Sequence, residues 1–381
     1  MSKKIISEVL LEVAEAIETG NFGKKIKIGL TTLGSEHGVE NMLKGARLAK
    51  NDLFDIVLIG QGAEDFESYE TTDEEEAHKV MEKLLDNEEI AACVTMHYNF
   101  PIGVSTVGRV ITPAAGKEMF IATTTGTSAT NRVEAMVRNA IYGLSTAKSV
   151  GIKKPTLGII NVEGARQTEK ILLELKENGY DFEFAESARA DGGSVMRGND
   201  LLIGTPDVMV TDSLTGNLFM KVFSSFTTGG DYEAHGFGYG PGIGEDYSRR
   251  ILILSRASGS PVVANALKYA YDVSVGTVNE VARKEYVEAK KAGLDKLFSD
   301  LKAKEKGADK EDEEVVAPPK EVVSSQIAGV DIMDLEDATK ALWKAGIYAE
   351  NGMGCTGPIV LVTSANKPKA REILREAGLL V

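Results

Sequence analysis

Residues 351–362 read NGMGCTGPIVLV and place Cys355, one of two cysteines in the chain, in a glycine-rich turn before an apolar run. Glycines beside a thiol let backbone N–H groups approach the sulfur, where they stabilise a thiolate or an oxyanion. The alternative is a structural cysteine, which rarely needs such surroundings. We therefore predict that Cys355 is a catalytic nucleophile, and that Gly354, Thr356 and Gly357 form its oxyanion turn.

The other cysteine, Cys93, lies four residues before His97 in the stretch ACVTMHYNFP. A Cys–His pair can act as nucleophile and base, and continued strand geometry would put both side chains on one face. A cysteine with apolar neighbours is more often buried and inert. We favour that interpretation and keep Cys93 with His97 as a candidate second thiol site.

The segment LSRASGSPVVANAL (254–267) has the residue types of a phosphate site. An arginine offers a bidentate fork to phosphate, while serine hydroxyls and helix N-terminal amides add further donors. The alternative is a Ser/Gly loop with a surface arginine. We expect phosphate or an acyl phosphate to bind here, through Ser255, Arg256, Ser258 and Ser260.

Two further polar segments precede helical patterns, TTTGTSATNR (123–132) and TDSLTGN (211–217). The second follows a strand, and ligands of α/β sheets bind at the carboxyl ends of parallel strands. The alternative for the second segment is that Thr215 and Asn217 only cap a helix, and polar glycine loops like the first are common without binding an anion. The candidates for anion or acetyl binding are Thr125, Thr127, Asn131, Arg132, Thr215 and Asn217.

Short apolar runs alternate with helical patterns along the chain, which predicts repeated β-α-β units. We therefore expect an α/β fold whose mainly parallel sheet has helices on both faces. The expected strands are 26–33, 55–59, 89–95, 119–125, 156–162, 181–187 and 206–212. The expected helices are 38–50, 74–87, 129–151, 168–179 and 276–305.

Composition divides the chain into a body (1–301), a charged and proline-bearing linker (302–324) and a small α/β module (325–381) that carries Cys355. The linker suggests that the module swings between a donor and the phosphate site. In the body, residues 229–244 contain seven glycines. No strand leads directly into them, so we reject a dinucleotide-binding loop and predict a mobile flap.

The net charge of −14 and a pI near 5.0 disfavour nucleic acid and anionic membranes as partners. No apolar stretch reaches the length of a membrane span. Residues 1–20 read as an amphipathic helix of the mature protein. The two cysteines, without an export signal, are expected to be reduced in the cytoplasm. Without a CxxC motif or a Cys/His cluster, we predict no metal.

The segments 198–221 (GNDLLIGTPDVMVTDSLTGNLFMK), 258–270 (SGSPVVANALKYA) and 26–49 resemble the superfamily of PlsX-like phosphate acyltransferases and phosphotransacetylases. ACVTMHYNFPIGVSTVGRV, TTTGTSATNRVEAMVRNAIYG and GMGCTGPIVLV resemble more closely the alpha subunits of protein C of the glycine/sarcosine/betaine reductases. The resemblance covers essentially the whole chain. It implies the PlsX/phosphotransacetylase fold, which is isopropylmalate dehydrogenase-like, with an added C-terminal module.

In that family, protein A is a selenoprotein that presents a two-carbon unit on a carboxymethylated selenocysteine. Protein C takes this unit over as an acetyl thioester, on the cysteine that matches Cys355, and phosphate then releases acetyl phosphate. The resemblance thus implies inorganic phosphate as a substrate, no tightly bound cofactor and a cytoplasmic hetero-oligomer. Its expected partners are protein A and a thiolase-like beta subunit.

One departure from the superfamily pattern separates the alternatives. The catalytic serine and arginine of phosphotransacetylases match Ser255 and Arg256, but the position of their aspartate base is approximately Val262 here. This disfavours an ordinary coenzyme A phosphotransacetylase, because a pre-formed protein thiolate needs that base less. Two alternatives stay open: a free-standing phosphate acyltransferase using coenzyme A or acyl carrier protein, and a non-catalytic scaffold for the beta subunit.

Overall fold

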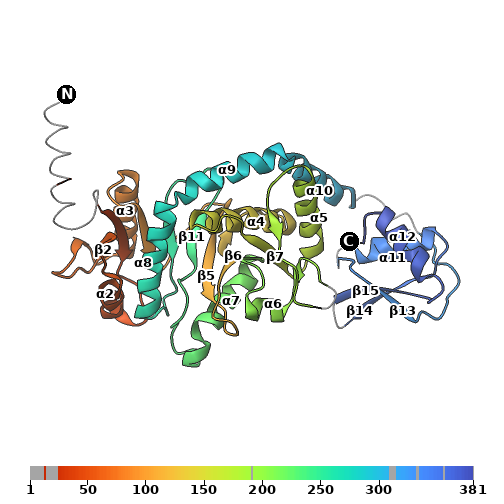
Figure 1. Cartoon of the computed structure of the whole chain (residues 1–381), viewed down its shortest axis with the longest axis horizontal. Helices are drawn as coiled ribbons and strands as arrows, with labels where there is room; N and C mark the ends of the chain where they lie inside the picture. The colour runs from red at the N-terminus through yellow and green to blue at the C-terminus, as the bar shows by residue number, and fades with distance from the viewer. Residues whose placement is uncertain are drawn as a thin grey trace.

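A computed structural model describes Val13 and residues 25–189, 192–308, 315–331, 334–354 and 357–380 (Figure 1). The described chain forms a layered α/β body, with a small sheet-containing module at its C-terminal end (Figure 1). The predicted α/β class is therefore confirmed, including a large and mostly parallel sheet between helices.

The strands of the body are β1 (Ile26–Thr31), β2 (Phe54–Gly60), β3 (Glu67–Glu70), β4 (Ala92–Thr95), β5 (Val104–Ile111), β6 (Glu118–Thr127), β7 (Thr156–Ile160), β8 (Glu183–Phe184), β9 (Val195–Met196), β10 (Val208–Val210), β11 (Gly240–Ile243) and β12 (Ile251–Ile253). Its helices are α2 (Gly38–Ala49), α3 (Glu74–Asp86), α4 (Arg132–Ser149), α5 (Ala165–Glu177), α6 (Gly198–Ile203), α7 (Ser213–Ser225), α8 (Ser260–Val275), α9 (Val278–Lys291) and α10 (Leu294–Ala308), with a one-turn helix at Phe226–Thr228.

The large sheet has the strand order β3-β2-β1-β4-β12-β11-β5-β6-β10-β7-β8, with β9 beside β7. The strands from β3 to β12 are parallel to one another, and so are β6, β10, β7, β8 and β9. Between these halves, β11 and β5 pair only in antiparallel fashion. The strands of the two halves consequently run in opposite directions. The carboxyl ends of one half therefore lie at the same side of the sheet as the amino ends of the other half.

Helices cover both faces of this sheet, and each face has its own hydrophobic cluster. The larger cluster joins α2, α4, α5, α8 and α9 to one face, and the smaller joins α3, α6 and α7 to the other. Figure 1 shows α4 and α9 on one side of the strands and α6 and α7 on the other. Apolar side chains fill both faces of the central strands, which explains their nearly continuous hydrophobic runs.

The glycine-rich segment 229–244 is not a flap, so that prediction was wrong. Its last residues form β11, which pairs with both β12 and β5 in the middle of the sheet. A glycine here lets the backbone of β11 lie close to that of β5, because a Cβ on Gly240 would lie 1.7 Å from the Val107 carbonyl oxygen. The expected helix 276–305 is two helices, α9 and α10, separated at Gly293, which has a φ of +98°.

The C-terminal module consists of β13 (Ser325–Ala328), α11 (Leu335–Lys344), β14 (Glu350–Gly354), β15 (Gly357–Val362) and α12 (Lys367–Glu376). Its antiparallel sheet has the order β13-β15-β14, and its buried side chains form a third hydrophobic cluster, separate from the two of the body. Helix α10 continues to Ala308, inside the segment expected to be a linker. The division at 302–324 stays a prediction.

The module caps a helix of the body. Helix α5 begins after Gly164, which has no side chain to accept a hydrogen bond from the first-turn amides. The amide of Arg166 donates instead to the buried Asp331 carboxylate of the module, at 3.2 Å. Gln167 Nε2 donates to Asp334 Oδ1 at 3.1 Å, and Lys170 Nζ donates to the Gly378 carbonyl at 2.7 Å. These three contacts are polar, as in domain interfaces that open.

We expect the substitution Asp334→Asn to stabilise this interface at neutral pH. Burial, and next the nearby Asp331 charge, raise the pKa of Asp334 above its ordinary value. The folded state therefore binds this proton more tightly than the unfolded chain. That stabilisation is fully present below the ordinary aspartate pKa of about 4 and is lost as pH rises through the raised value. The asparagine can still accept the Gln167 hydrogen bond.

Thermal unfolding of both proteins between pH 4 and 8 measures this effect. The midpoint of the variant should exceed that of the wild type at pH 8, and the difference should shrink as pH falls. Glu372→Gln is the matched control, since it removes an exposed carboxylate from α12 of the same module. An equal gain in the control, or a difference independent of pH, would contradict the prediction.

Candidate functional site

A buried carboxylate organises the polar cluster after β12. Glu233 is 1% exposed and accepts three hydrogen bonds from side chains. Lys221 Nζ donates to Oε1 at 2.8 Å, Tyr239 OH donates to Oε1 at 3.0 Å, and Ser258 Oγ donates to Oε2 at 2.7 Å. Burial, and next the Glu233 charge, raise the pKa of Tyr239 well above its usual range, so its hydroxyl stays a donor.

The same cluster holds Ser255 beside the lysine. Lys221 Nζ donates to Ser255 Oγ at 2.5 Å, and the Ser255 amide donates to Ser258 Oγ at 3.2 Å. The lysine side chain is 45% exposed, whereas the Glu233 side chain is 2% exposed. The Lys221 side chain is therefore held by a buried carboxylate and is partly open to solvent. Such an arrangement suits a small anion, which would meet a lysine, a serine hydroxyl and few mobile groups.

The other two residues of the predicted phosphate segment point elsewhere. Arg256 donates to Glu74 Oε2 at 3.0 Å and to the Gly34 carbonyl at 3.2 Å, so its guanidinium faces the end of β1 rather than Ser255. Ser260 begins α8 and lines a separate cavity of about 470 Å³. His37, Asn41 and Lys44 line the same cavity.

A second polar cluster lies at the start of α4 and α7. Arg132 bridges Glu163 and Asp212, with 3.2 Å between the paired atoms in each case. Asp212 caps α7 and accepts the Thr215 hydroxyl at 2.7 Å. Burial would raise the pKa of Asp212, but the Thr215 hydrogen bonds and the Arg132 charge outweigh it and lower the value. Asn131 caps α4 through the Glu134 amide.

A cavity of about 440 Å³ adjoins this second cluster. Its lining includes Asn131, Arg132 and Gln167, and Gln167 also contacts the module. The carboxylates around Arg132 already satisfy its charge, so helix capping and ion pairing account for the residues seen here. The alternative interpretation of the segments 123–132 and 211–217 thus explains the contacts of Asn131, Arg132 and Thr215.

The remaining anion candidates belong to the packing of α7 on β6. The Thr125 carbonyl accepts the Thr123 hydroxyl at 3.2 Å, and the exposed Thr127 accepts the Gly103 amide on its carbonyl at 2.8 Å. Asn217 Nδ2 donates to the Thr124 carbonyl at 3.2 Å. Gly216 lets the helix approach, because a Cβ there would lie 1.8 Å from the Thr123 carbonyl oxygen.

Helix α7 connects the two clusters. Asp212 precedes its first residue and Lys221 lies nine positions further, which corresponds to ~14 Å along a helix. The carboxyl ends of β10 and β12 point in opposite directions, since the strands of the two halves run in opposite directions. The predicted residues therefore form two clusters rather than one site.

Cys93 and His97 do not form a pair. Cys93 is 0% exposed on β4, and its sulfur packs beside Gly29 and Ile90. Burial raises the pKa of its thiol far above the usual range. His97 is exposed in the loop that follows β4. The strand ends before the histidine, so the period of two no longer relates the two side chains.

Cys355 and Thr356 lie outside the described residues. Gly354 and Gly357, the neighbours that we assigned to the oxyanion turn, pair with each other at the ends of β14 and β15. The roles of all four residues stay predictions. Both strands belong to the module, and the module contacts the body through α5.

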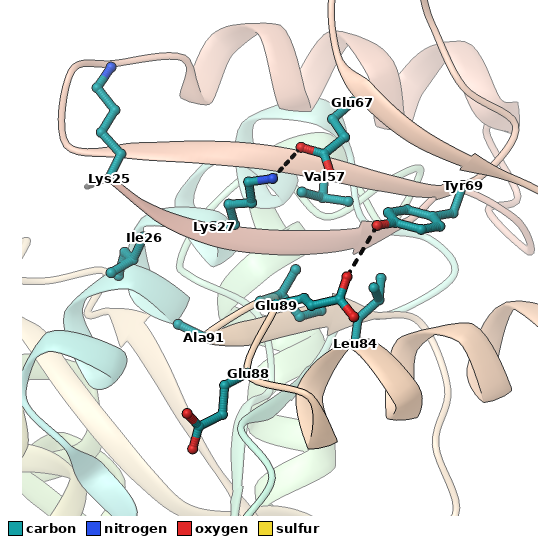
Figure 2. Close-up of a pocket in the computed structure, with 11 residues that line it drawn as sticks. Lys25, Ile26, Lys27, Val57, Glu67, Tyr69, Leu84, Glu88, Glu89 and Ala91 are labelled. Atoms are coloured by element: carbon teal, nitrogen blue, oxygen red, sulfur yellow. Dashed lines mark hydrogen bonds and ion pairs between the residues drawn. The ribbon is translucent and has the colours of Figure 1, made fainter. Parts of the chain in front are cut away.

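A further cavity is not near either cluster. It measures about 480 Å³ and lies where β1 and β4 begin (Figure 2). Figure 2 shows two pairs among its polar groups, with Lys27 Nζ 2.5 Å from Glu67 Oε2 and Tyr69 OH 3.4 Å from Glu89 Oε2. The side chain of Glu88 points away from these pairs (Figure 2). Nothing in this lining suggests chemistry.

Sequence reasoning missed Lys221 and Glu233. Lys221 is the one charged residue within the segment 213–225, and a lone charge in an apolar helix was a signal that went unused. Glu233 lies inside the segment interpreted as a flap, where no local pattern marks a buried carboxylate. None of the described helices is both long and apolar enough to span a bilayer. Within the described ranges, no three acidic, histidine or cysteine side chains gather to hold a metal ion.

Comparisons with known proteins identify the family. The family model described as "Fatty acid synthesis protein" matches residues 26–361. The chain is 64% identical to the glycine/sarcosine/betaine reductase complex component C subunit alpha of Peptoclostridium acidaminophilum, over 99% of both chains. It is 25% identical to a phosphate acyltransferase of Thermotoga neapolitana, over 51% of this chain and 68% of that protein.

Among solved structures, the phosphotransacetylase EutD from Staphylococcus aureus matches with a TM-score of 0.42 and 13% identity, over 69% of this chain and 98% of that chain. The sequence matches confirm both resemblances that the motifs indicated. The chain belongs to the fatty acid synthesis protein family and groups with the alpha subunits of component C of the glycine/sarcosine/betaine reductase complex.

Proposed function

We propose that this chain is the acetyl phosphate-forming subunit of protein C in a glycine, sarcosine or betaine reductase. It would receive a two-carbon unit from the carboxymethylated selenocysteine of protein A as an acetyl thioester on Cys355. The carbon–selenium bond breaks and the methylene carbon becomes a methyl group, while the selenium is oxidised to a selenide–sulfide with a second thiol. The carboxylate releases hydroxide as its carbon bonds to the Cys355 sulfur. Phosphate would then cleave that thioester. The observation that carries the proposal is the half-exposed Lys221 side chain, whose ammonium group is held beside Ser255 by a buried glutamate.

The relatives support this proposal at two levels. The name of the relative that is 64% identical over nearly the whole chain refers to a reductase complex component. The more distant relatives named phosphate acyltransferase match 51% and 25% of this chain. Acyl transfer to or from phosphate is therefore the chemistry that we assign to the body. We assign the protein-bound thioester to Cys355 in the C-terminal module.

The assigned step is a phosphorolysis. An oxygen of inorganic phosphate attacks the thioester carbonyl carbon, and a tetrahedral oxyanion forms. The carbon–sulfur bond then breaks, the electron pair leaves with the Cys355 sulfur, and acetyl phosphate is released. Phosphate is already deprotonated at neutral pH, so this direction needs no aspartate base at the position of Val262.

Lys221 supplies the positive charge that this step requires. Phosphate carries between one and two negative charges at pH 7 and reacts through one oxygen, so a fixed cation can hold the others. Ser255 Oγ, at 2.5 Å from Lys221 Nζ, adds a hydroxyl. Glu233 lies behind the ammonium and sets its direction without reaching solvent, since its side chain is 2% exposed.

The module has to move for this step. It contacts the start of α5, after the carboxyl end of β7, whereas Ser255 follows the carboxyl end of β12, which points the opposite way. Its described contacts with α5 are a few hydrogen bonds, and its hydrophobic cluster is its own. Interfaces of this polar kind open readily. We therefore propose that the docked position belongs to one stage of the cycle and that the module carries acetyl to Lys221 at another. Crosslinking the module to α5 should then abolish phosphorolysis while leaving acetyl on the thiol.

Replacing the proposed nucleophile should abolish acetyl transfer. We expect the purified chain, with its beta subunit present, to take up [14C]acetyl from acetyl phosphate as a hydroxylamine-sensitive thioester. Cys355→Ser should lose this label. Cys93→Ser is the matched control and should keep it, because Cys93 is fully buried.

Each outcome selects one function. Full acetyl exchange in Cys355→Ser would exclude a thioester on Cys355. It would favour a phosphate acyltransferase that uses coenzyme A or acyl carrier protein. Absence of label and exchange in every form would favour a scaffold for the beta subunit. Loss of label only in Cys93→Ser would move the thioester to the buried strand.

Removing the lysine should weaken the phosphate step specifically. We expect Lys221→Ala to lower kcat/KM for arsenolysis of acetyl phosphate by about 10²–10³-fold, the usual effect of losing one preorganised transition-state donor. Lys221→Arg keeps the charge and should recover part of the rate. Steady-state kinetics with arsenate as the varied substrate measures the effect.

Lys268→Ala is the control, since it removes an exposed lysine from α8 at a distance from the cluster. It should change the rate by less than about twofold, as exposed charges usually do. Equal effects of Lys268→Ala and Lys221→Ala would refute the assignment of Lys221. Thermal unfolding of each variant separates a loss of activity from a loss of structure.

A further inference from the structure

Two helices begin at one cavity, the space of about 470 Å³ that Ser260 lines. His37 precedes α2 and Gly259 precedes α8, and both residues line this cavity. Neither caps its helix with a side-chain hydrogen bond. The first amides of a helix carry partial positive charge and need acceptors. Helices of 12 and 16 residues therefore place their positive ends at the same cavity.

A buried hydroxyl in this cavity is free to bind a ligand. Ser260 is only 7% exposed, and within the described ranges its hydroxyl has no hydrogen-bond partner. Nearly all buried polar groups in proteins are hydrogen-bonded, so a free one calls for an explanation. Because Ser260 lines the cavity, a ligand bound there would be the missing partner.

Lys44 supplies a full positive charge to the same cavity. It is exposed on α2, and it forms no ion pair with any residue that the structure describes. Lysine is a frequent partner of phosphate groups in proteins, and helix N-termini are common phosphate sites. Lys44, the Ser260 hydroxyl and the two helix starts thus offer the donors that a phosphate group requires.

The rest of the wall fits a nucleoside. Tyr232 is 36% exposed and lies edge-to-face with His37, with 6.1 Å between the ring centroids, so an aromatic surface adjoins the cavity. Bases of nucleotides stack on such rings. The exposed Glu40 carboxylate would repel a phosphate but can accept hydrogen bonds from ribose hydroxyls. The volume is also that of a pocket for an organic ligand rather than for phosphate alone.

The cavity shares a loop with the Lys221 cluster. His37 Nε2 donates to the Ala257 carbonyl at 3.3 Å, and Asn41 Nδ2 donates to the Ser258 carbonyl at 2.9 Å. The Ser258 hydroxyl in turn donates to Glu233 on the other side of that loop. Two residues of the cavity therefore hold the loop that carries Ser255, and a ligand bound beside them would act on its position.

We propose that this cavity is a nucleotide site, in which Lys44, Ser260 and the two helix starts hold a phosphate group and Tyr232 packs on the base. A nucleoside monophosphate is the smallest ligand that uses all of these groups. The site is distinct from the place beside Lys221 that we assigned to inorganic phosphate. The proposal does not rest on the proposed function, because it uses only the lining of this cavity.

Isothermal titration calorimetry of the full chain with AMP tests this, with inorganic phosphate as the comparison. The wild type should bind AMP at least about tenfold more tightly than phosphate, because only AMP can stack on Tyr232. Lys44→Ala and Ser260→Ala should each weaken AMP binding by at least about tenfold, since each removes a donor to a charged group. Tyr232→Leu should weaken the binding of AMP but not that of phosphate.

Lys268→Ala is the matched control, since it removes an exposed lysine further along α8, and it should bind AMP as the wild type does. Lys221→Ala should also keep AMP binding. Loss of AMP binding in Lys221→Ala but not in Lys44→Ala would overturn the proposal, because the nucleotide would then occupy the other cluster.

Three further results would overturn the nucleotide site. These are a wild-type chain that does not bind AMP at millimolar concentration, one that binds phosphate as tightly as AMP, and equal weakening by Lys44→Ala and Lys268→Ala. Circular dichroism and thermal unfolding verify that each variant is folded, so that a loss of binding is not a loss of structure.

Discussion

One buried carboxylate needs hydrogen-bond donors, and this need determines the geometry of the candidate site. Glu233 is almost fully buried, and an unpaired charge in such a place would be strongly destabilising. Donors from Lys221, Tyr239 and Ser258 prevent this. These donors come from α7, from the residue before β11 and from the loop after β12, so the carboxylate ties three separate segments together. The direction of the lysine, and hence the place where an anion would bind, follows from that arrangement.

A second constraint comes from the direction of the strands. The antiparallel pair β11 and β5 reverses the sheet, and the loops after β10 and β12 therefore emerge at opposite edges. Helix α7 starts at one edge with Asp212 and reaches the other with Lys221. The module is docked at the first edge, through the amide end of α5. A thioester carried by the module and a phosphate held by Lys221 meet only if the module changes position.

Much of the fold could be predicted from the sequence because local patterns decide it. The strand at 55–59 and the helix at 38–50 are each marked by apolar spacing and a terminating residue, and both formed nearly as expected. The segment 229–244 misled, because glycines that allow backbone approach look the same as glycines that allow motion. Ser255 was predicted to bind phosphate, which stays a prediction. Its donor Lys221 is 34 residues away in sequence, and Glu233 accepts the Ser258 hydroxyl across 25 residues. Pairing at that separation depends on tertiary packing.

The most direct test of the account is the dependence of deacetylation on phosphate. The chain acetylated on its thiol would be mixed with increasing phosphate in a single turnover, and the rate of acetyl phosphate formation measured. If phosphate binds beside Lys221 before it attacks, the rate will saturate as the site fills. A rate that rises in proportion to phosphate at all concentrations, as for a free thioester in solution, would contradict the account.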